Sequence, residues 1–173
     1  MKVTSLKIKD VKLIEPDIFK DERGLFYESF NQQKFNEAVS QNITFVQDNH
    51  SKSSKGVLRG LHYQEAPFAQ GKLVRVVAGE VFDVAVDIRK DSPTYNKWVA
   101  EILSSENKKQ LWIPEGFAHG FLALSNEVEF LYKTTNYYSK QHERLIPFDD
   151  DELKIKWPHM SKYILSTKDS FKK

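Results

Sequence analysis

The chain has 173 residues, no cysteine, 40% hydrophobic residues and a formal net charge of +2, from 26 basic against 24 acidic side chains. This balance argues against a dedicated nucleic-acid-binding protein, and the absence of cysteine excludes disulfides, thiolate nucleophiles and zinc–thiolate sites. The length suits one domain with a sizeable core, so we expect a single domain over residues 1–173.

The first predicted element is a short helix over residues 31–39. Asn31 is a suitable N-cap, because its side-chain oxygen can accept a hydrogen bond from a backbone N–H of the first turn. Phe35, Ala38 and Val39 would then share the buried side of the helix.

Two strands are predicted next, over residues 72–77 and 81–88, with Ala-Gly-Glu at 78–80 as a plausible hairpin turn between them. Within the second strand, alternation puts four apolar side chains on one face and Asp83 and Asp87 on the other. Three more short strands are expected further along the chain, at 110–114, 118–124 and 128–135.

An acidic run at residues 149–151 could open a second short helix that reaches residue 155, since acidic side chains favour a helix N-terminus. Helix is otherwise sparse. Many short strands with turns between them are typical of a β-sandwich or β-barrel. We therefore predict an all-β protein with a few short peripheral helices.

The N-terminal residues lack the apolar core of a signal peptide, and no run approaches the length of a membrane span. We therefore expect a cytoplasmic protein with no membrane partner. The glycosylation sequon Asn-Ile-Thr at 42–44 is then expected to be coincidental.

The most informative segment is Gly-Val-Leu-Arg-Gly-Leu-His-Tyr-Gln at 56–64, in which His62 precedes Lys72 by ten residues. A base beside a cation is what removal of a proton next to a carbonyl group requires, because the cation can stabilise the enolate. Lys72 alternates with Val74 and Val76, so its amine could point into an apolar interior. Each residue also has a structural alternative: a half-buried histidine, and a lysine that reaches solvent from a sheet edge.

Three further titratable side chains are candidates. Tyr132 alternates with apolar residues at 128 and 130, and His119 does so with Phe117 and Phe121. Asp169 lies near the C-terminus. The structural alternatives are a core tyrosine, a core histidine and a solvated carboxylate.

Arginines provide possible clamps for an anion, because the guanidinium group matches the geometry of phosphate. Arg59 is three residues from His62, so a regular strand would send the two side chains to opposite faces. Gly60 between them could permit a bulge that brings both to one cavity, or Arg59 could reach the site of a neighbouring subunit. The other arginines considered are Arg23, Arg75, Arg89 and Arg144.

Ordered motifs across nearly the whole chain resemble the dTDP-4-dehydrorhamnose 3,5-epimerase family, the sugar-nucleotide epimerases of the cupin superfamily. The resemblance implies a cupin jelly roll, usually a homodimer, that acts on a dTDP-4-keto-6-deoxyhexose without a metal or redox cofactor. The motifs that carry it lie at residues 21–28, 47–51, 58–64, 70–75, 112–120, 130–135 and 165–169.

By position, the resemblance implies that His62 is the base and that Asp169 is its carboxylate partner. Lys72 would stabilise the enolate, and Tyr132 would return a proton to the opposite face of the sugar. Tyr138 would stack on the thymine ring. The other positions that would contact the substrate are Arg23, Glu28, Gln47, Asn49, Arg59, His119, Glu143 and Lys168.

The expected reaction inverts C3 and C5 of dTDP-4-keto-6-deoxy-D-glucose, since a ketone at C4 acidifies the C–H bonds at both carbons. One alternative is a sister cupin that inverts a single centre, isomerises the ketone or takes another nucleotide-linked 4-keto sugar. Another is a sugar-nucleotide-binding cupin without catalysis, and a third is a metal-dependent cupin. Metal-binding cupins usually carry a His-x-His pair, where this chain has His62-x-Gln64, so we expect no metal.

Overall fold

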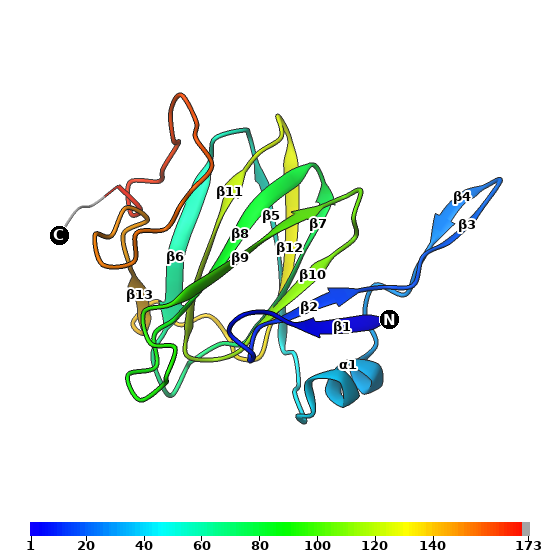
Figure 1. Ribbon diagram of the computed structural model, residues 1–173, viewed down its shortest axis with the longest axis horizontal. Helices are drawn as coiled ribbons and strands as arrows, with labels where there is room; N and C mark the ends of the chain where they lie inside the picture. Colours follow the sequence, from blue (N-terminus) through cyan, green and yellow to red (C-terminus); the bar gives the residue numbers. More distant parts are fainter. Residues whose placement is uncertain (171–173) are drawn as a thin grey trace.

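Two antiparallel β-sheets lie face to face in the computed structural model of this protein, which describes residues 1–170 (Figure 1). A single α-helix within the described residues lies outside the sandwich. The predicted all-β fold is therefore confirmed. Among the same residues, no helix is long and apolar enough to cross a membrane.

The first sheet has the order β1 (Lys2–Ser5), β2 (Lys12–Glu15), β10 (Gln110–Ile113), β7 (Lys72–Ala78), β12 (Val128–Thr134) and β5 (Gln47–Ser53). The second has the order β13 (Glu143–Leu145), β6 (Leu58–Gln64), β11 (Phe117–Ala123), β8 (Glu80–Asp87) and β9 (Trp98–Ser104). A separate hairpin, β3 (Phe19–Asp21) and β4 (Gly24–Phe26), extends away from the sandwich and precedes α1 (Gln32–Val39) (Figure 1).

The main core lies between the two sheets and follows from the alternation of side chains along their strands. Val74 on β7 and Phe130 on β12 belong to the same buried cluster as Ala85 on β8 and Phe121 on β11. Burial of this apolar surface is what holds the sheets together.

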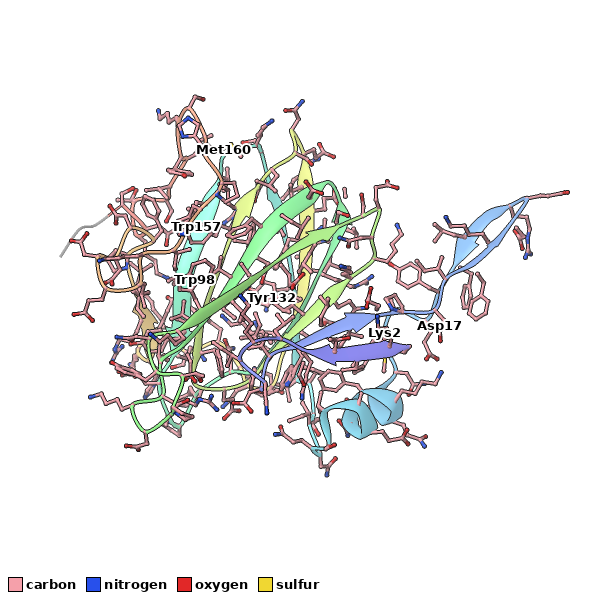
Figure 2. The ribbon with its side chains drawn as sticks, viewed as in Figure 1. Lys2, Asp17, Trp98, Tyr132, Trp157 and Met160 are labelled. Carbon is pink, nitrogen blue, oxygen red and sulfur yellow. The ribbon has the colours of Figure 1, made fainter. Side chains whose placement is uncertain are left out.

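The outer faces of both sheets are partly covered. On the first sheet, Phe35 and Val39 of α1 pack against Trp112. On the second, Leu153 and Trp157 from the segment after β13 pack over β6, β8 and β11, and Figure 2 shows Trp157 beside this sheet. The outer faces of the two sheets are therefore buried only where these segments cover them.

The predicted helix at 31–39 is confirmed, and Asn31 caps it by accepting from the backbone N–H of Lys34 at 3.1 Å. The second predicted helix is wrong. Asp150 accepts from the backbone N–H of Leu153, but this closes only a turn. Lys154 follows with φ of 46°, a left-handed conformation that ends a helical turn.

The predicted hairpin at 78–80 is also wrong, because β7 and β8 belong to different sheets. Gly79, with φ of +74°, turns the chain from one sheet to the other. A Cβ atom on Gly79 would lie 2.1 Å from the carbonyl oxygen of Glu127, so the corner also needs a residue without a side chain. The sequence correctly indicates a turn here. The strands on either side of it do not pair with each other, because β7 pairs with β10 and β12, and β8 pairs with β9 and β11.

The alternation predicted for β8 is confirmed, with Phe82, Val84 and Val86 on the outer face. Asp83 and Asp87 do not face solvent, however, since both are wholly buried. The segment after β13 covers the apolar face, and the aspartate face points inward. This orientation of β8 places the carboxylate of Asp83 inside the sandwich.

Candidate active site

A cavity of about 510 Å³ lies between the two sheets, within the size range of small-molecule binding sites. Its walls come from β5, β6, β7, β11, β12 and β13, and from the C-terminal segment 166–169. Figure 2 shows Tyr132 of β12 between the strands of the sandwich. All predicted site residues except Arg23 and Glu28 line this cavity: His62, Lys72, Tyr132, Asp169, Gln47, Asn49, Arg59, His119, Tyr138, Glu143 and Lys168.

A bulge in β6 brings Arg59 and His62 to the same cavity. Along the ladder between β6 and β11, His62 pairs with His119 while Arg59 pairs with Phe121, so β6 has one extra residue between these pairs. Gly60 lies in the bulge with φ of +119°, a conformation that favours glycine. The bulge that the sequence allowed at Gly60 is therefore present, and Arg59 lines the cavity of its own chain.

The two ring nitrogens of His62 each face a carboxylate. Nε2 lies 2.6 Å from Oδ1 of Asp169, and Nδ1 lies 3.1 Å from Oε1 of Glu143. A neutral imidazole has one N–H donor and one acceptor nitrogen, so it can donate to only one of them. The shorter contact, to the more buried Asp169, favours the proton on Nε2 and the lone pair on Nδ1.

Asp169 is only 6% exposed although it lies close to the end of the chain. The C-terminal segment folds back on β6, where the carbonyl of Ile164 accepts from the N–H of Leu58 at 3.0 Å. Ser166 then donates to the Asp169 carboxylate at 2.7 Å. Burial alone would raise the pKa of Asp169, but hydrogen bonds from His62 and Ser166 hold it below its ordinary value. The alternative of a solvated terminal carboxylate is therefore wrong.

Glu143 joins three of the predicted site residues. Besides its contact with His62, its carboxylate forms an ion pair with Nζ of Lys168 and accepts from the hydroxyl of Tyr138 at 2.9 Å. Burial would raise the pKa of Glu143, but its interactions with Lys168, His62 and Tyr138 outweigh burial and lower it to about 2. The group is therefore negative at neutral pH.

Lys72 has the inward orientation that the alternation of β7 predicted. It is 8% exposed and shares the inner face of the strand with Val74. Its Nζ donates to the backbone carbonyl of His62 at 3.2 Å. Burial lowers the pKa of Lys72 to about 8, while the carboxylates of Asp83 and Glu143 act in the opposite direction.

Tyr132 lies in the first sheet, whereas His62 lies in the second. Burial raises the pKa of the Tyr132 phenol, an effect that the positive charge of Arg59 partly offsets. The phenol is therefore protonated at neutral pH. His62 and the protonated Tyr132 phenol thus line the cavity from different sheets.

At the rim of the cavity, Gln47 forms hydrogen bonds with Asn49 and Tyr138. Its Nε2 donates to Oδ1 of Asn49 at 2.9 Å, and its Oε1 accepts from the backbone N–H of Tyr138 at 3.1 Å. The Tyr138 residue is 55% exposed, so its ring presents an aromatic surface at the rim.

Several polar side chains at or behind the cavity wall were not predicted from the sequence, among them Asp83, Ser166 and Ser51. Asp83 contacts Nε2 of His119, Ser166 binds Asp169, and the buried hydroxyl of Ser51 has no hydrogen-bond partner among the described residues. Alternation along β8 was the available signal for Asp83. A polar strand face in an antiparallel sheet more often indicates solvent than an interior, so this signal pointed the wrong way.

Arg23 and Glu28 do not line the cavity of their own chain. Arg23 lies at the turn of the β3–β4 hairpin, where its side chain is 90% exposed and pairs with Asp21. Glu28 lies just before α1 and accepts from Nζ of Lys34 at 2.8 Å. Figure 1 shows the hairpin extending far from the sandwich.

Within residues 1–170, no group of three or more histidine, aspartate or glutamate side chains is arranged to hold a metal ion. Gln64, which takes the place of the second histidine of a His-x-His pair, is fully engaged in backbone contacts. It donates to the carbonyls of Phe68 and Tyr137 and accepts from the N–H of Ser139 at 2.7 Å.

A sequence model of the family described as dTDP-4-dehydrorhamnose 3,5-epimerase matches residues 5–173 of this chain. The dTDP-4-dehydrorhamnose 3,5-epimerase of Shigella flexneri is 64% identical over 169 residues, which are 98% of this chain and 93% of that protein. The enzyme of the same name from Pseudomonas aeruginosa is 60% identical over 169 residues, with the same shares covered.

A crystal structure with a similar fold is that of dTDP-6-deoxy-D-glucose-3,5-epimerase RmlC from Legionella pneumophila, in complex with dTDP-4-keto-L-rhamnose. Its TM-score to this structure is 0.94 and its sequence identity is 54%. The comparison covers 97% of this chain and 89% of the Legionella chain.

Proposed function

The chain belongs to the dTDP-4-dehydrorhamnose 3,5-epimerase family, and from this we infer that it is an isomerase that inverts C3 and C5 of dTDP-4-keto-6-deoxy-D-glucose. The product would be dTDP-4-keto-L-rhamnose, the molecule held by the similar Legionella enzyme. The observation that carries this proposal is the convergence of His62, Lys72 and Tyr132 on one cavity.

His62 acts as the base in this proposal. Nε2–H donates to Asp169, which orients the ring and stabilises the imidazolium that forms, and Nδ1 takes the proton from the carbon next to the ketone. The bound sugar replaces Glu143 as the neighbour of Nδ1. The electron pair of the broken C–H bond moves into the C4 carbonyl and gives an enolate.

Lys72 stabilises this enolate through its ammonium group, which is held in a buried wall where charge interacts strongly. Tyr132 then donates a proton to the same carbon from the opposite wall of the cavity. Because His62 and Tyr132 stand on different sheets, a sugar between them loses its proton on one face and regains one on the other. The configuration of the carbon is therefore inverted, and exchange of protons with water restores both groups for the second centre.

The remaining cavity residues would bind the nucleotide diphosphate. Arg59 and Lys168 supply positive charge for the phosphates, and the exposed ring of Tyr138 suits stacking on the thymine base. No metal or redox cofactor takes part in this scheme. Since the two sheets share one core, we propose that residues 1–173 act as one domain, in the cytoplasm.

We also propose that the protein works as a homodimer. The β3–β4 hairpin exposes large apolar side chains, with Phe19 at 63% and Phe26 at 69%, and such a patch calls for a partner. If this hairpin reaches the cavity of a second subunit, Arg23 can contact the substrate there. Glu28 follows the same hairpin in the chain, so it would then also lie near the substrate in the second subunit.

The test is proton NMR of dTDP-4-keto-6-deoxyglucose incubated with the protein in deuterated water without added cofactor. We expect the signals of both the C3 and the C5 protons to disappear. Loss of one signal alone would replace the proposal with a single-centre epimerase, and loss of neither would refute it. The His62→Asn variant is the control, and it should bind dTDP while leaving both signals intact.

A further inference from the structure

A second histidine–carboxylate pair lies behind the cavity wall, and the mechanism above does not use it. Nε2 of His119 lies 3.0 Å and 2.9 Å from the two carboxylate oxygens of Asp83. Asp83 is wholly buried, and His119 is 8% exposed and lines the cavity. A buried carboxylate without a partner is strongly unfavourable, so this contact must be a donated hydrogen bond from Nε2–H.

Two neighbouring strands hold the Asp83 and His119 side chains in place. Asp83 stands on β8 and His119 on the neighbouring strand β11, in the ladder that pairs Asp83 with Phe121 and His119 with Ala85. Both are interior strands of their sheet, and the His119 ring stacks near Phe130 with 6.1 Å between ring centres. The imidazole therefore has little freedom to turn or to exchange its partner.

We propose that Asp83 is a positioning residue for the epimerisation: it keeps Nε2 of His119 protonated, so that Nδ1 faces the bound sugar. The inference rests on the proposed function for its consequence in catalysis. Its structural content, the tautomer of His119, can be measured without turnover, and so can the link between Asp83 and Lys72.

The link to Lys72 is electrostatic. Burial disfavours the Lys72 ammonium, and the negative charges of Asp83 and Glu143 favour it, so loss of either carboxylate lowers the pKa of Lys72 below about 8. Asp83 contributes from β8 and Glu143 from β13, two strands of the same sheet. The other titratable groups that line this cavity are Arg59, His62, Tyr63, His119, Tyr132, Tyr138, Lys168 and Asp169.

The first experiment uses the wild-type protein. Long-range ¹H–¹⁵N correlation spectra report which nitrogen of each histidine carries the proton, and we expect Nε2–H for His119 at neutral pH. A neutral His119 protonated on Nδ1 would overturn the proposal. This measurement needs no variant, so it decides the matter even if substitution of Asp83 prevents folding.

The second experiment uses Asp83→Asn, which keeps the shape of the side chain and removes its charge. The amide can donate to Nε2 of His119 and so favour the opposite tautomer, as happens when the carboxylate of a catalytic histidine is replaced by an amide. We expect kcat to fall at least about tenfold. We also expect the alkaline limb of the kcat profile, and the titration of ¹³C-labelled Lys72, to move to lower pH.

Asp87→Asn is the matched control, because Asp87 is also wholly buried on β8 but binds Arg89, Ser92 and Thr94 away from the cavity. This variant should lower the melting temperature while leaving the His119 tautomer and the alkaline limb unchanged. A folded Asp83→Asn protein with both readouts unchanged would overturn the proposal. Failure of the wild type to exchange the C3 and C5 protons would instead refute the proposed function, and the two NMR readouts on Asp83 would still stand.

Discussion

Burial of Lys72 sets the pH range in which its side chain carries a positive charge. Its pKa of about 8 leaves the ammonium largely charged at pH 7, and the charge is lost as pH rises above that value. We expect kcat to fall on the alkaline side with a midpoint near this pKa, because the enolate then has no cation. A profile of kcat between about pH 6 and 10 checks this. A profile that stays flat over this range would contradict the role of Lys72.

Lys72→Arg is the companion variant for the same profile. Arginine keeps its charge throughout this range, so its residual activity should no longer decline at high pH. If the decline persists in Lys72→Arg, another group causes it.

Tyr132 permits a sharper test, because removal of a proton and inversion are separate events. In Tyr132→Phe the base His62 can still take a proton and return a deuteron to the same face. We therefore expect C3 and C5 to exchange with deuterated water while the product yield falls at least about a hundredfold. NMR of the sugar gives exchange and configuration in the same spectrum. Normal product formation by Tyr132→Phe would remove this residue from the proposed mechanism.

At the scale of elements, the bulge in β6 is what allows one strand to supply both Arg59 and His62 to the cavity. A Cβ atom on Gly60 would lie 2.6 Å from both the Cα of Gly120 and the carbonyl oxygen of His119. We expect Gly60→Ala to destabilise the protein by about 2 kcal/mol or more, since strain at positive φ adds to a backbone clash. Urea unfolding measures the loss, and the deuterium-exchange assay should show reduced activity.

Gly24→Ala is the control for this prediction. Gly24 has φ of +125°, similar to Gly60, but a Cβ atom on Gly24 would have no other atom within 4 Å. It therefore reports the cost of the backbone conformation without the clash. Equal destabilisation by the two substitutions would show that packing of β6 against β11 does not require glycine.

At the scale of the whole molecule, the exposed apolar side chains of the hairpin and the exposed Arg23 at its turn lead us to expect a dimer. We expect light scattering to give about twice the 20.2 kDa of the chain. Coexpressed Arg23→Ala and His62→Asn chains should regain activity that neither variant has alone. Random mixing makes half of the dimers mixed, each with one complete site, so recovery should approach about one quarter of the wild-type activity.

This complementation separates two arrangements of the dimer. If Arg23 completes the cavity of the partner subunit, the mixed dimer has one site with both wild-type residues. If each hairpin serves its own chain, or no substrate at all, mixing restores nothing beyond the sum of the two variants.

The sequence by itself determined the all-β class and the helix at 31–39, and its resemblance to a known family gave most of the polar residues that line the cavity. The class and the helix depend on local properties: the period-two alternation of strands and the capping of a helix by Asn31. For Lys72, alternation with Val74 indicated an inward amine but left a lysine at the sheet edge open, and the structure shows the inward orientation.

Only the tertiary structure decided which strands pair across the corner at Gly79, which face of β8 is inside, and where Asp169 and Arg23 lie. The physical reason is that burial and pairing depend on residues far apart in the chain. His62 and Asp169 are separated by 107 positions and meet because the C-terminal segment folds back on β6. Asp83 is inside because a later segment covers the apolar face of its strand, which no local pattern around it reveals.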